Sequence, residues 1–170
     1  MIIVREEHVT ETPLIEALIE SAFGRRDEAR LVNALRSHTS EFVSLVVLDA
    51  GELIANAVLT AVTIEGALGV RGLGLAPVCV SPQHRGRGIG TALVRHALQR
   101  SMHGEVGFAV VWGDTEYYAR FGFKPASAFG LRDESAASAA TMQAVEFWPG
   151  ALRHCTGTVR YAPEFSLVAG

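Results

Sequence analysis

The chain has 170 residues, of which 49% are hydrophobic and 19% charged, and a formal net charge of −3 at pH 7. This length is enough for one domain with a hydrophobic core, and the composition is typical of a globular protein rather than a disordered one. The slightly acidic balance argues against a general nucleic-acid-binding protein, and no apolar run reaches the roughly 18 residues of a membrane span.

The N-terminus and the cysteines bear on the compartment. Residues 1–8 read as a strand and lack the regions of a signal peptide, so we expect no export. Cys79 and Cys155 lie in no metal-spaced cluster, and without export we expect reduced thiols. The six histidines show no paired metal spacing. We therefore expect a cytoplasmic protein of a single domain, residues 1–170, without a bound metal.

The first half of the chain predicts a strand, two helices and an antiparallel meander. Residues 2–5 read as the strand. Pro13 suits the first turn of a helix whose apolar residues repeat at helical spacing up to Ala22. A second helix covers residues 28–36 after a polar break. Three strands joined by short turns follow at 41–48, 53–64 and 70–80.

The second half begins with a helix at 88–102, which Gly104 ends, and an apolar strand at 106–112. A strand, a helix and a strand in this order form a β-α-β unit, so strands 70–80 and 106–112 should be parallel neighbours. Shorter elements are expected at 116–121, from Phe123, at 144–147 and at 158–161. The sequence thus predicts a mixed α/β domain with helices over both faces of a central sheet.

The most informative stretch is 76–95, in which an apolar strand breaks at Ser81-Pro82 and enters a basic, glycine-rich turn that opens a helix. Glycines let an anion approach the backbone, and the first N–H groups of a helix attract it. The spacing of Gly86, Gly88 and Gly90 matches neither a P-loop nor a dinucleotide-binding fingerprint. The turn therefore predicts a phosphate site of another kind.

The pattern Arg85-x-x-Gly88-x-Gly90 resembles the Arg/Gln-x-x-Gly-x-Gly/Ala signature of the GNAT superfamily of N-acetyltransferases. In that superfamily the turn cradles the pyrophosphate of acetyl-CoA, and here Arg87 adds a second positive charge. On this motif alone, a glycine-rich helix start without a ligand stays open.

A second motif, Tyr-Tyr-Ala-Arg-Phe-Gly-Phe, ends at Phe123. GNAT members carry a tyrosine four residues before a Gly-Phe pair, and Tyr118 occupies that position. The two motifs occur in the right order with an apolar strand between them, which is more specific than either alone. From Gly113 onward the stretch also resembles the YhbS-like predicted bacterial acetyltransferases. Asp114 departs from the wider superfamily, in which many members have Asn.

The resemblance implies a GNAT-type fold, with a central mixed sheet in which two parallel strands splay apart. It also implies that the pantetheine arm enters this gap and bonds to the main chain of Val78 and Val80, with Tyr118 near the coenzyme sulfur. The residues expected to bind acetyl-CoA, the acyl donor, are Val78, Cys79, Val80, Arg85, Gly86, Arg87, Gly88, Ile89, Gly90 and Thr91.

The implied reaction is direct attack of a primary amine on the thioester in a ternary complex, with Tyr118 as the acid that protonates the thiolate. A core aromatic role for Tyr118 stays open. No base is assigned, because Glu28, Glu65 and Asp114 each read as surface or capping carboxylates. Cys79 invites an acyl-cysteine, but strand alternation points it away from Val78 and Val80, so we expect a buried hydrophobe.

Two alternatives to an N-acetyltransferase remain at this point: a non-catalytic acyl-CoA sensor, and a structural domain without coenzyme. The acceptor is a small-molecule amine or a protein amino group, with neither nucleic acid nor membrane as a partner. By resemblance the loop with Arg25 and Arg26 borders the acceptor site. The sequence leaves the oligomeric state open, a homodimer included.

Overall fold

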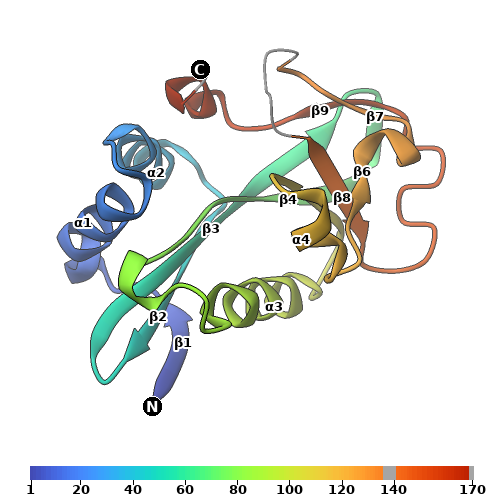
Figure 1. Cartoon of the computed structure of the whole chain (residues 1–170). Coiled ribbons are helices and arrows are strands. Elements are labelled where there is room, and N and C mark those ends of the chain that lie inside the picture. The colour runs from blue at the N-terminus through green and yellow to red at the C-terminus, as the bar shows by residue number, and fades with distance from the viewer. Residues whose placement is uncertain (136–140, 169–170) are drawn as a thin grey trace.

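A nine-stranded mixed sheet forms the centre of the computed structural model, which describes residues 1–135 and 141–168 (Figure 1). The strands are β1 (Ile2–Glu6), β2 (Phe42–Asp49), β3 (Glu52–Ile64), β4 (Ala67–Val80), β5 (Val106–Trp112), β6 (Lys124–Pro125), β7 (Leu131–Asp133), β8 (Met142–Glu146) and β9 (Gly157–Arg160). The α-helices are α1 (Thr12–Phe23), α2 (Asp27–His38), α3 (Ile89–Ser101) and α4 (Thr115–Ala119). Short 3-10 segments are η1 (Val9–Glu11), η2 (Pro82–His84), η3 (Ala126–Phe129) and η4 (Pro163–Val168).

The helices and strands expected before residue 112 are all present, and their ends differ from the predicted ones by at most three residues. The largest difference is at β4, which begins at Ala67 rather than at residue 70, because it continues its hairpin with β3 to the turn. β7 was not predicted, since three residues are too few to show a periodic pattern.

The strands lie in the order β1-β2-β3-β4-β5-β8-β6, and β9 pairs with both β3 and β7. β4 and β5 are parallel neighbours joined through α3, which confirms the predicted β-α-β unit. β7 and β9 are also parallel, whereas the other neighbouring pairs are antiparallel.

Helices cover both faces of the sheet, as predicted (Figure 1). Alternate residues of β3 point to opposite faces. Leu59 packs in a cluster with Leu93 of α3. Val58 packs instead in a cluster with Ile15 of α1 and Leu31 of α2. The sheet is therefore buried on both sides, with α3 on one face and α1 and α2 on the other.

The parallel strands β4 and β5 separate at their carboxyl ends. Their pairing runs from Arg71 opposite Val106 to Gly74 opposite Val110. Beyond Gly74, β4 continues to Val80 while paired with β3. This is the splay that the family resemblance implied. It leaves an opening next to the first turn of α3 and next to α4, because both helices start just after these strand ends.

Candidate active site

A cavity of about 270 Å³ lies at the splayed end of β4. It is bounded by the end of α1, the start of α3 and the short helix α4. Its lining residues are Ala22, Phe23, Val78, Cys79, Val80, Arg85, Gly90, Tyr117 and Tyr118. The structure thus brings together residues from both sequence motifs, which lie apart in the chain. Whether they contact the coenzyme stays a prediction.

The main chain of β4 faces this cavity at alternate residues. Ser81 donates its backbone N–H to the carbonyl of Ile54 on β3. In an antiparallel pair, residues alternate between bonding to the partner strand and pointing away from it. Counting back from Ser81, the N–H and C=O groups of Val80 and Val78 point away from β3, toward the opening. The two N–H groups and the carbonyl of Val78 are available to an extended arm laid along β4, whereas the carbonyl of Val80 accepts a bond from Arg85.

The glycine-rich turn has the backbone that its sequence requires. Gly86 and Gly88 have φ angles of 73° and 76°, in the left-handed region that disfavours a side chain. Gly88 is the N-cap of α3, and a Cβ built on it meets no other atom within 4 Å. The space in front of the first turn of α3 is therefore open, and the free N–H groups of that turn are suited to an anion.

The two arginines of the turn also make contacts within the protein. Arg85 donates from Nη2 to the carbonyl of Ala22 at 2.7 Å and from Nε to that of Val80 at 3.3 Å. Arg87 lies 3.5 Å from the carboxylate of Asp49. Arg85 therefore ties the last turn of α1 to the end of β4, in addition to making the turn positive.

Tyr118 is half-buried against other aromatic side chains. Its ring centroid lies 5.7 Å from that of Phe123 and 5.0 Å from that of Tyr117. A Cβ on Gly113 would lie only 3.0 Å from the Tyr118 ring, so a side chain at position 113 would crowd the ring. Burial, and then the neighbouring Tyr117, raises the pKa of Tyr118 to about 12. At neutral pH the phenol is thus a proton donor.

Tyr117 is a cavity residue for which the sequence predicts no role. Its hydroxyl lies 3.4 Å from Oγ1 of Thr91, and a Cβ on Gly90 would also be 3.4 Å from it. The guanidinium of Arg120 sits 4.4 Å from the centroid of the Tyr117 ring. The side chain therefore links α4 to the first turn of α3. The only signal in the sequence was its place beside Tyr118.

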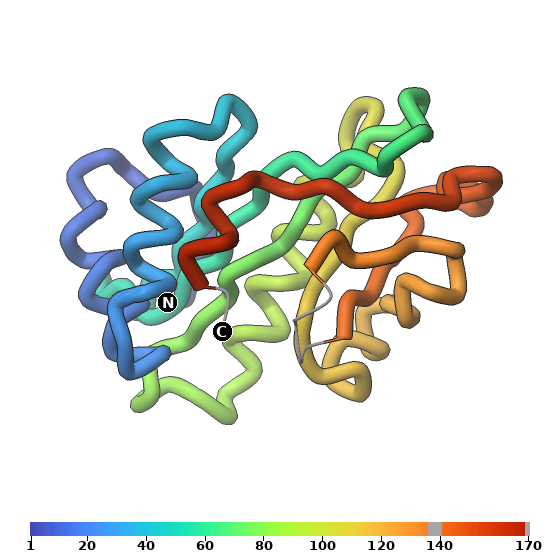
Figure 2. The backbone as a smooth tube through the Cα atoms, turned by 90° about the horizontal axis from the view of Figure 1, so that it is seen from above, coloured from blue at the N-terminus to red at the C-terminus, as the bar shows by residue number. Residues whose placement is uncertain are grey.

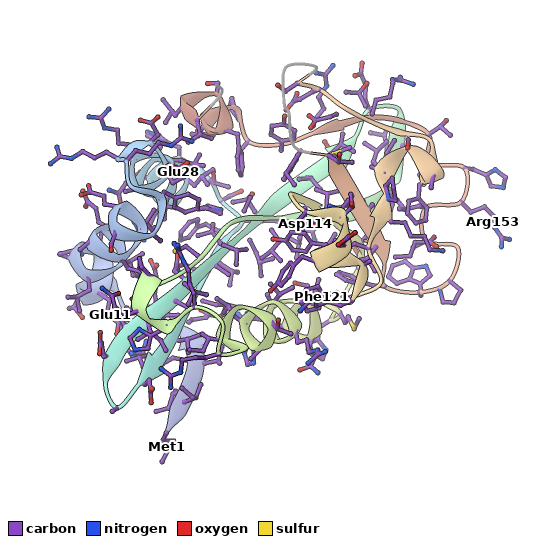
Figure 3. All side chains as sticks on the ribbon, viewed as in Figure 1. Met1, Glu11, Glu28, Asp114, Phe121 and Arg153 are labelled. Atoms are coloured by element: carbon purple, nitrogen blue, oxygen red, sulfur yellow. The ribbon has the colours of Figure 1, made fainter. Side chains whose placement is uncertain are left out.

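The three candidate bases lie in different surroundings, and Figure 3 labels two of them, Glu28 on α2 and Asp114 at the start of α4. Asp114 caps α4 by accepting the backbone N–H of Glu116 at 2.9 Å, as expected. Glu65 is an exposed carboxylate paired with Arg160. For Glu28 the expectation of a surface carboxylate was wrong, because it is only 6% exposed.

Glu28 can be buried because a counter-ion folds over it. Arg25 donates from Nη2 to Oε1 of Glu28 at 2.6 Å, and from Nε to both carboxylate oxygens, at 3.0 and 3.1 Å. The two side chains are three positions apart at the start of α2, a spacing that favours such a pair. With both oxygens held by Arg25, Glu28 is better suited to a structural ion pair than to accepting a proton.

Cys79 points to the opposite face of the sheet from Val78 and Val80, as alternation predicted. It is 7% exposed and packs in the cluster under α1 and α2, whereas the two valines pack in the cluster under α3. Burial raises the pKa of its thiol to about 12. A protonated thiol is a poor nucleophile, so the surroundings of Cys79 suit a packing role.

A larger hollow, of about 520 Å³, lies at the other end of the sheet. Phe42, Arg100 and Val106 are among its lining residues, so it sits beside the last turn of α3 and the start of β5. None of the residues expected to bind the coenzyme lines it. Its size therefore does not make it the better candidate for the active site.

Within residues 1–135 and 141–168, no group of three or more His, Cys, Asp or Glu side chains could hold a metal ion. No helix of the same two ranges has the length and the hydropathy to cross a membrane.

Comparisons with known proteins show the family of the chain. Residues 4–126 match the profile of the acetyltransferase (GNAT) domain. A curated relative, the uncharacterized N-acetyltransferase YhbS of Escherichia coli K12, is 32% identical over 167 residues, covering 96% of this chain and 98% of the relative. The similarity thus extends over nearly the full length of both chains.

Two solved structures are similar throughout. The crystal structure of Escherichia coli YhbS in complex with CoA has a TM-score of 0.88 and 30% identity, covering 97% of this chain and 92% of that one. A GNAT family acetyltransferase from Brucella melitensis in complex with acetyl-CoA has a TM-score of 0.80 and 29% identity, covering 97% and 98%. The profile match spans well over half of the chain, and the chain belongs to the GNAT family of N-acetyltransferases.

Proposed function

We propose that residues 1–170 act as one acetyltransferase domain that moves the acetyl group of acetyl-CoA to a primary amine. The observation that carries this proposal is the cavity between the main chain of Val78 and Val80 and the phenol of Tyr118. The solved relatives in complex with CoA and with acetyl-CoA support acetyl-CoA as the acyl donor. We propose the cytoplasm as the compartment, on the sequence alone.

The turn and the strand would hold different parts of the donor. The N–H groups at the start of α3, with Gly86, Gly88 and the two arginines of the turn, would take the diphosphate. The main chain of Val78 and Val80 would pair with the amides of the pantetheine arm, because these groups point into the opening. The small Gly90 would let the arm pass close to α3, with Tyr117 on its other side.

The chemical step is a direct transfer. The N–H of Val80 would donate to the thioester oxygen and stabilise the negative charge that develops there. The amine nitrogen attacks the carbonyl carbon, so a C–N bond forms and the C–S bond breaks. Tyr118 gives its proton to the departing sulfur and regains one from solvent. The amine loses its own proton to water, since no carboxylate among the three candidates is placed as a base.

Thiol release from acetyl-CoA over a panel of small amines and lysine peptides tests this function. We expect release that depends on the amine and a mass gain of one acetyl group on it. Binding of CoA without release for any amine, the protein's own lysines included, would instead support an acyl-CoA sensor. Calorimetry that detects no CoA binding would contradict both and leave a structural domain.

A further inference from the structure

The opening between β4 and β5 has a second face, toward α1 and α2, which the cavity reaches only through Ala22 and Phe23 at the end of α1 and through Cys79. Because α3 and α4 cover the first face, the face of α1 and α2 is the side that is left for an acceptor amine. Trp112 is the last residue of β5 and lies two residues beyond Val110, the last one paired with β4. Residues two apart share a face, so Trp112 stands at the mouth of the opening on the acceptor side.

Trp112 belongs to a cluster of aromatic rings from distant parts of the chain. Its ring centroid lies 5.0 Å from that of Tyr161 and 6.1 Å from that of Phe165, and the latter two are 5.5 Å apart. The indole lies beside Gly74, since a Cβ there would be in ordinary contact with Trp112 Cζ3, at 3.7 Å. All three aromatic residues are partly exposed, so the cluster offers ring surface as well as packing.

One carboxylate fixes this cluster. Asp133 accepts the indole N–H of Trp112 at 2.7 Å, the hydroxyl of Tyr161 at 2.8 Å and the backbone N–H of Ser135 at 2.9 Å. Burial and the bond to Asp133 raise the pKa of Tyr161, which therefore stays neutral. With the polar edges of both rings engaged by Asp133, the cluster presents mainly carbon faces to a ligand.

The cluster depends on the C-terminal part of the chain. Asp133, Tyr161 and Phe165 all follow residue 126, where the match to the family profile ends. Figure 2 shows the segment after β9 crossing the sheet toward α2, and Phe165 packs in the cluster of α1 and α2. This segment therefore adds a wall to the acceptor side of the domain.

A polar group lies next to that wall. Thr60 is fully buried on β3, opposite Gly74 in the strand register and on the face of Trp112. Its hydroxyl has no hydrogen-bond partner among the residues that the structure describes. A buried hydroxyl without a partner is costly, and a donor arriving beside Gly74 would satisfy it.

We infer, on the basis of the proposed function, that the acceptor binds against Trp112, Tyr161 and Phe165 and is a primary amine carried on an aromatic group. Edge-to-face contacts between aromatic rings stabilise a complex beyond what the buried area alone contributes. The same faces attract the ammonium form of the amine as it arrives. Asp133 acts as a positioning residue, because it orients the rings and does not touch the reacting atoms.

Two amines of nearly equal size test the inference: 2-phenylethylamine and 2-cyclohexylethylamine. Thiol release should give a kcat/KM about 10-fold higher for the aromatic amine, the ratio that roughly 1.4 kcal/mol corresponds to. In Phe165→Leu and in Trp112→Leu the ratio should fall to near one, with the KM for acetyl-CoA unchanged. Trp148→Leu is the matched control, because Trp148 contacts Gly107 at the other end of β5.

Fluorescence provides a measurement that does not need turnover. The chain has two tryptophans, so Trp148→Phe leaves Trp112 as the single emitter. Titrating 2-phenylethylamine into this variant with CoA present should change its emission. In the converse variant, Trp112→Phe, the emission should not change during the titration, since Trp148 lies away from the opening.

The outcomes separate the two proposals. If wild type releases thiol with neither amine nor any other in the panel, the proposed function fails, and the Trp112 emission still decides where the amine binds. An unchanged emission overturns the inference. A wild-type ratio of the two kcat/KM values near one also overturns it. The same holds if the ratio is unchanged in both Phe165→Leu and Trp112→Leu.

Discussion

The two faces of the β4–β5 opening are built in different ways. The proposed coenzyme side consists of two continuous stretches, 76–95 and 113–123, each of which leads from the end of a strand, β4 or β5, into a helix. The proposed acceptor side consists of residues from separate parts of the chain, namely Thr60, Trp112, Asp133 and residues of the segment after β9. Continuous stretches keep their spacing in the sequence, so the first face can be read from a motif, whereas the second exists only once the chain has folded.

Glycines on the two faces also serve different purposes. Gly88, at the coenzyme turn, has a left-handed backbone and open space in front of it. Gly72, on the acceptor face, leaves room for a ring, since a Cβ there would lie 2.3 Å from Cζ of Phe108. The first glycine is needed for backbone geometry and for access of an anion, and the second for packing.

The largest effect should follow Gly88→Val. A β-branched residue at a φ of 76° is strained, and its side chain would occupy the space in front of the first turn of α3. We expect calorimetry to detect no CoA binding, while circular dichroism and a cooperative thermal transition show that the fold persists.

Gly104→Val is the control for the strain alone. Gly104 has a φ of 82° and open space around it, but it follows the far end of α3. Both substitutions should lower the free energy of unfolding by about 1–2 kcal/mol, the cost of a left-handed residue with a side chain. Full CoA affinity in Gly88→Val, or equal loss in Gly104→Val, would show that the turn is not the diphosphate site.

The contrast between the faces also explains what the sequence could predict. The β-α-β unit, the splay and the capping role of Asp114 depend on local patterns or on one family signature, and the structure confirms all three. The burial of Glu28 depends on where Arg25 folds, and the cluster around Asp133 joins residues 21 and 28 positions apart. Contacts of that kind leave no periodic signal in the sequence, and so they were missed.

Tyr118→Phe should have the next largest effect. The variant keeps the ring packed against Phe123 and loses only the hydroxyl, so affinity for acetyl-CoA should stay the same. The kcat should fall by roughly 10²–10⁴, as for a lost general acid. The loss should shrink with a donor whose thiol has a lower pKa. Wild-type kcat with the best acceptor would contradict the acid role.

The pH dependence of Tyr118 tests its burial. Its pKa of about 12 in the folded protein lies above the reference value of 10, so the unfolded chain ionises first. The stability that this neutral phenol contributes is complete below about pH 10 and is lost as the pH rises toward 12. Urea unfolding at about pH 9 and 11 measures this effect. Between these two pH values the free energy of unfolding should fall more for wild type than for Tyr118→Phe.

Tyr117→Phe should have a smaller effect of another kind. The neighbouring hydroxyl contacts Thr91 at the start of α3, so its removal should weaken the hold on the coenzyme. We expect the KM for acetyl-CoA to rise by about 3–10-fold, the value of one hydrogen bond, with kcat unchanged. The opposite split, with kcat reduced at constant KM, would exchange the roles of Tyr117 and Tyr118.

The smallest effect on catalysis should come from Cys79→Ala. The thiol packs under α1 and α2, on the opposite face from the main-chain groups of Val78 and Val80, and its pKa of about 12 keeps it protonated. We expect an unchanged kcat and a loss of about 1 kcal/mol in unfolding free energy, from the small space left in the core.

An acyl-enzyme route would instead abolish turnover in this variant. It would also leave one acetyl group on Cys79 of wild type incubated with acetyl-CoA and no amine, which mass spectrometry of the peptides would detect. Cys155→Ala, at the other free cysteine, shows whether any acetylation is specific to the site.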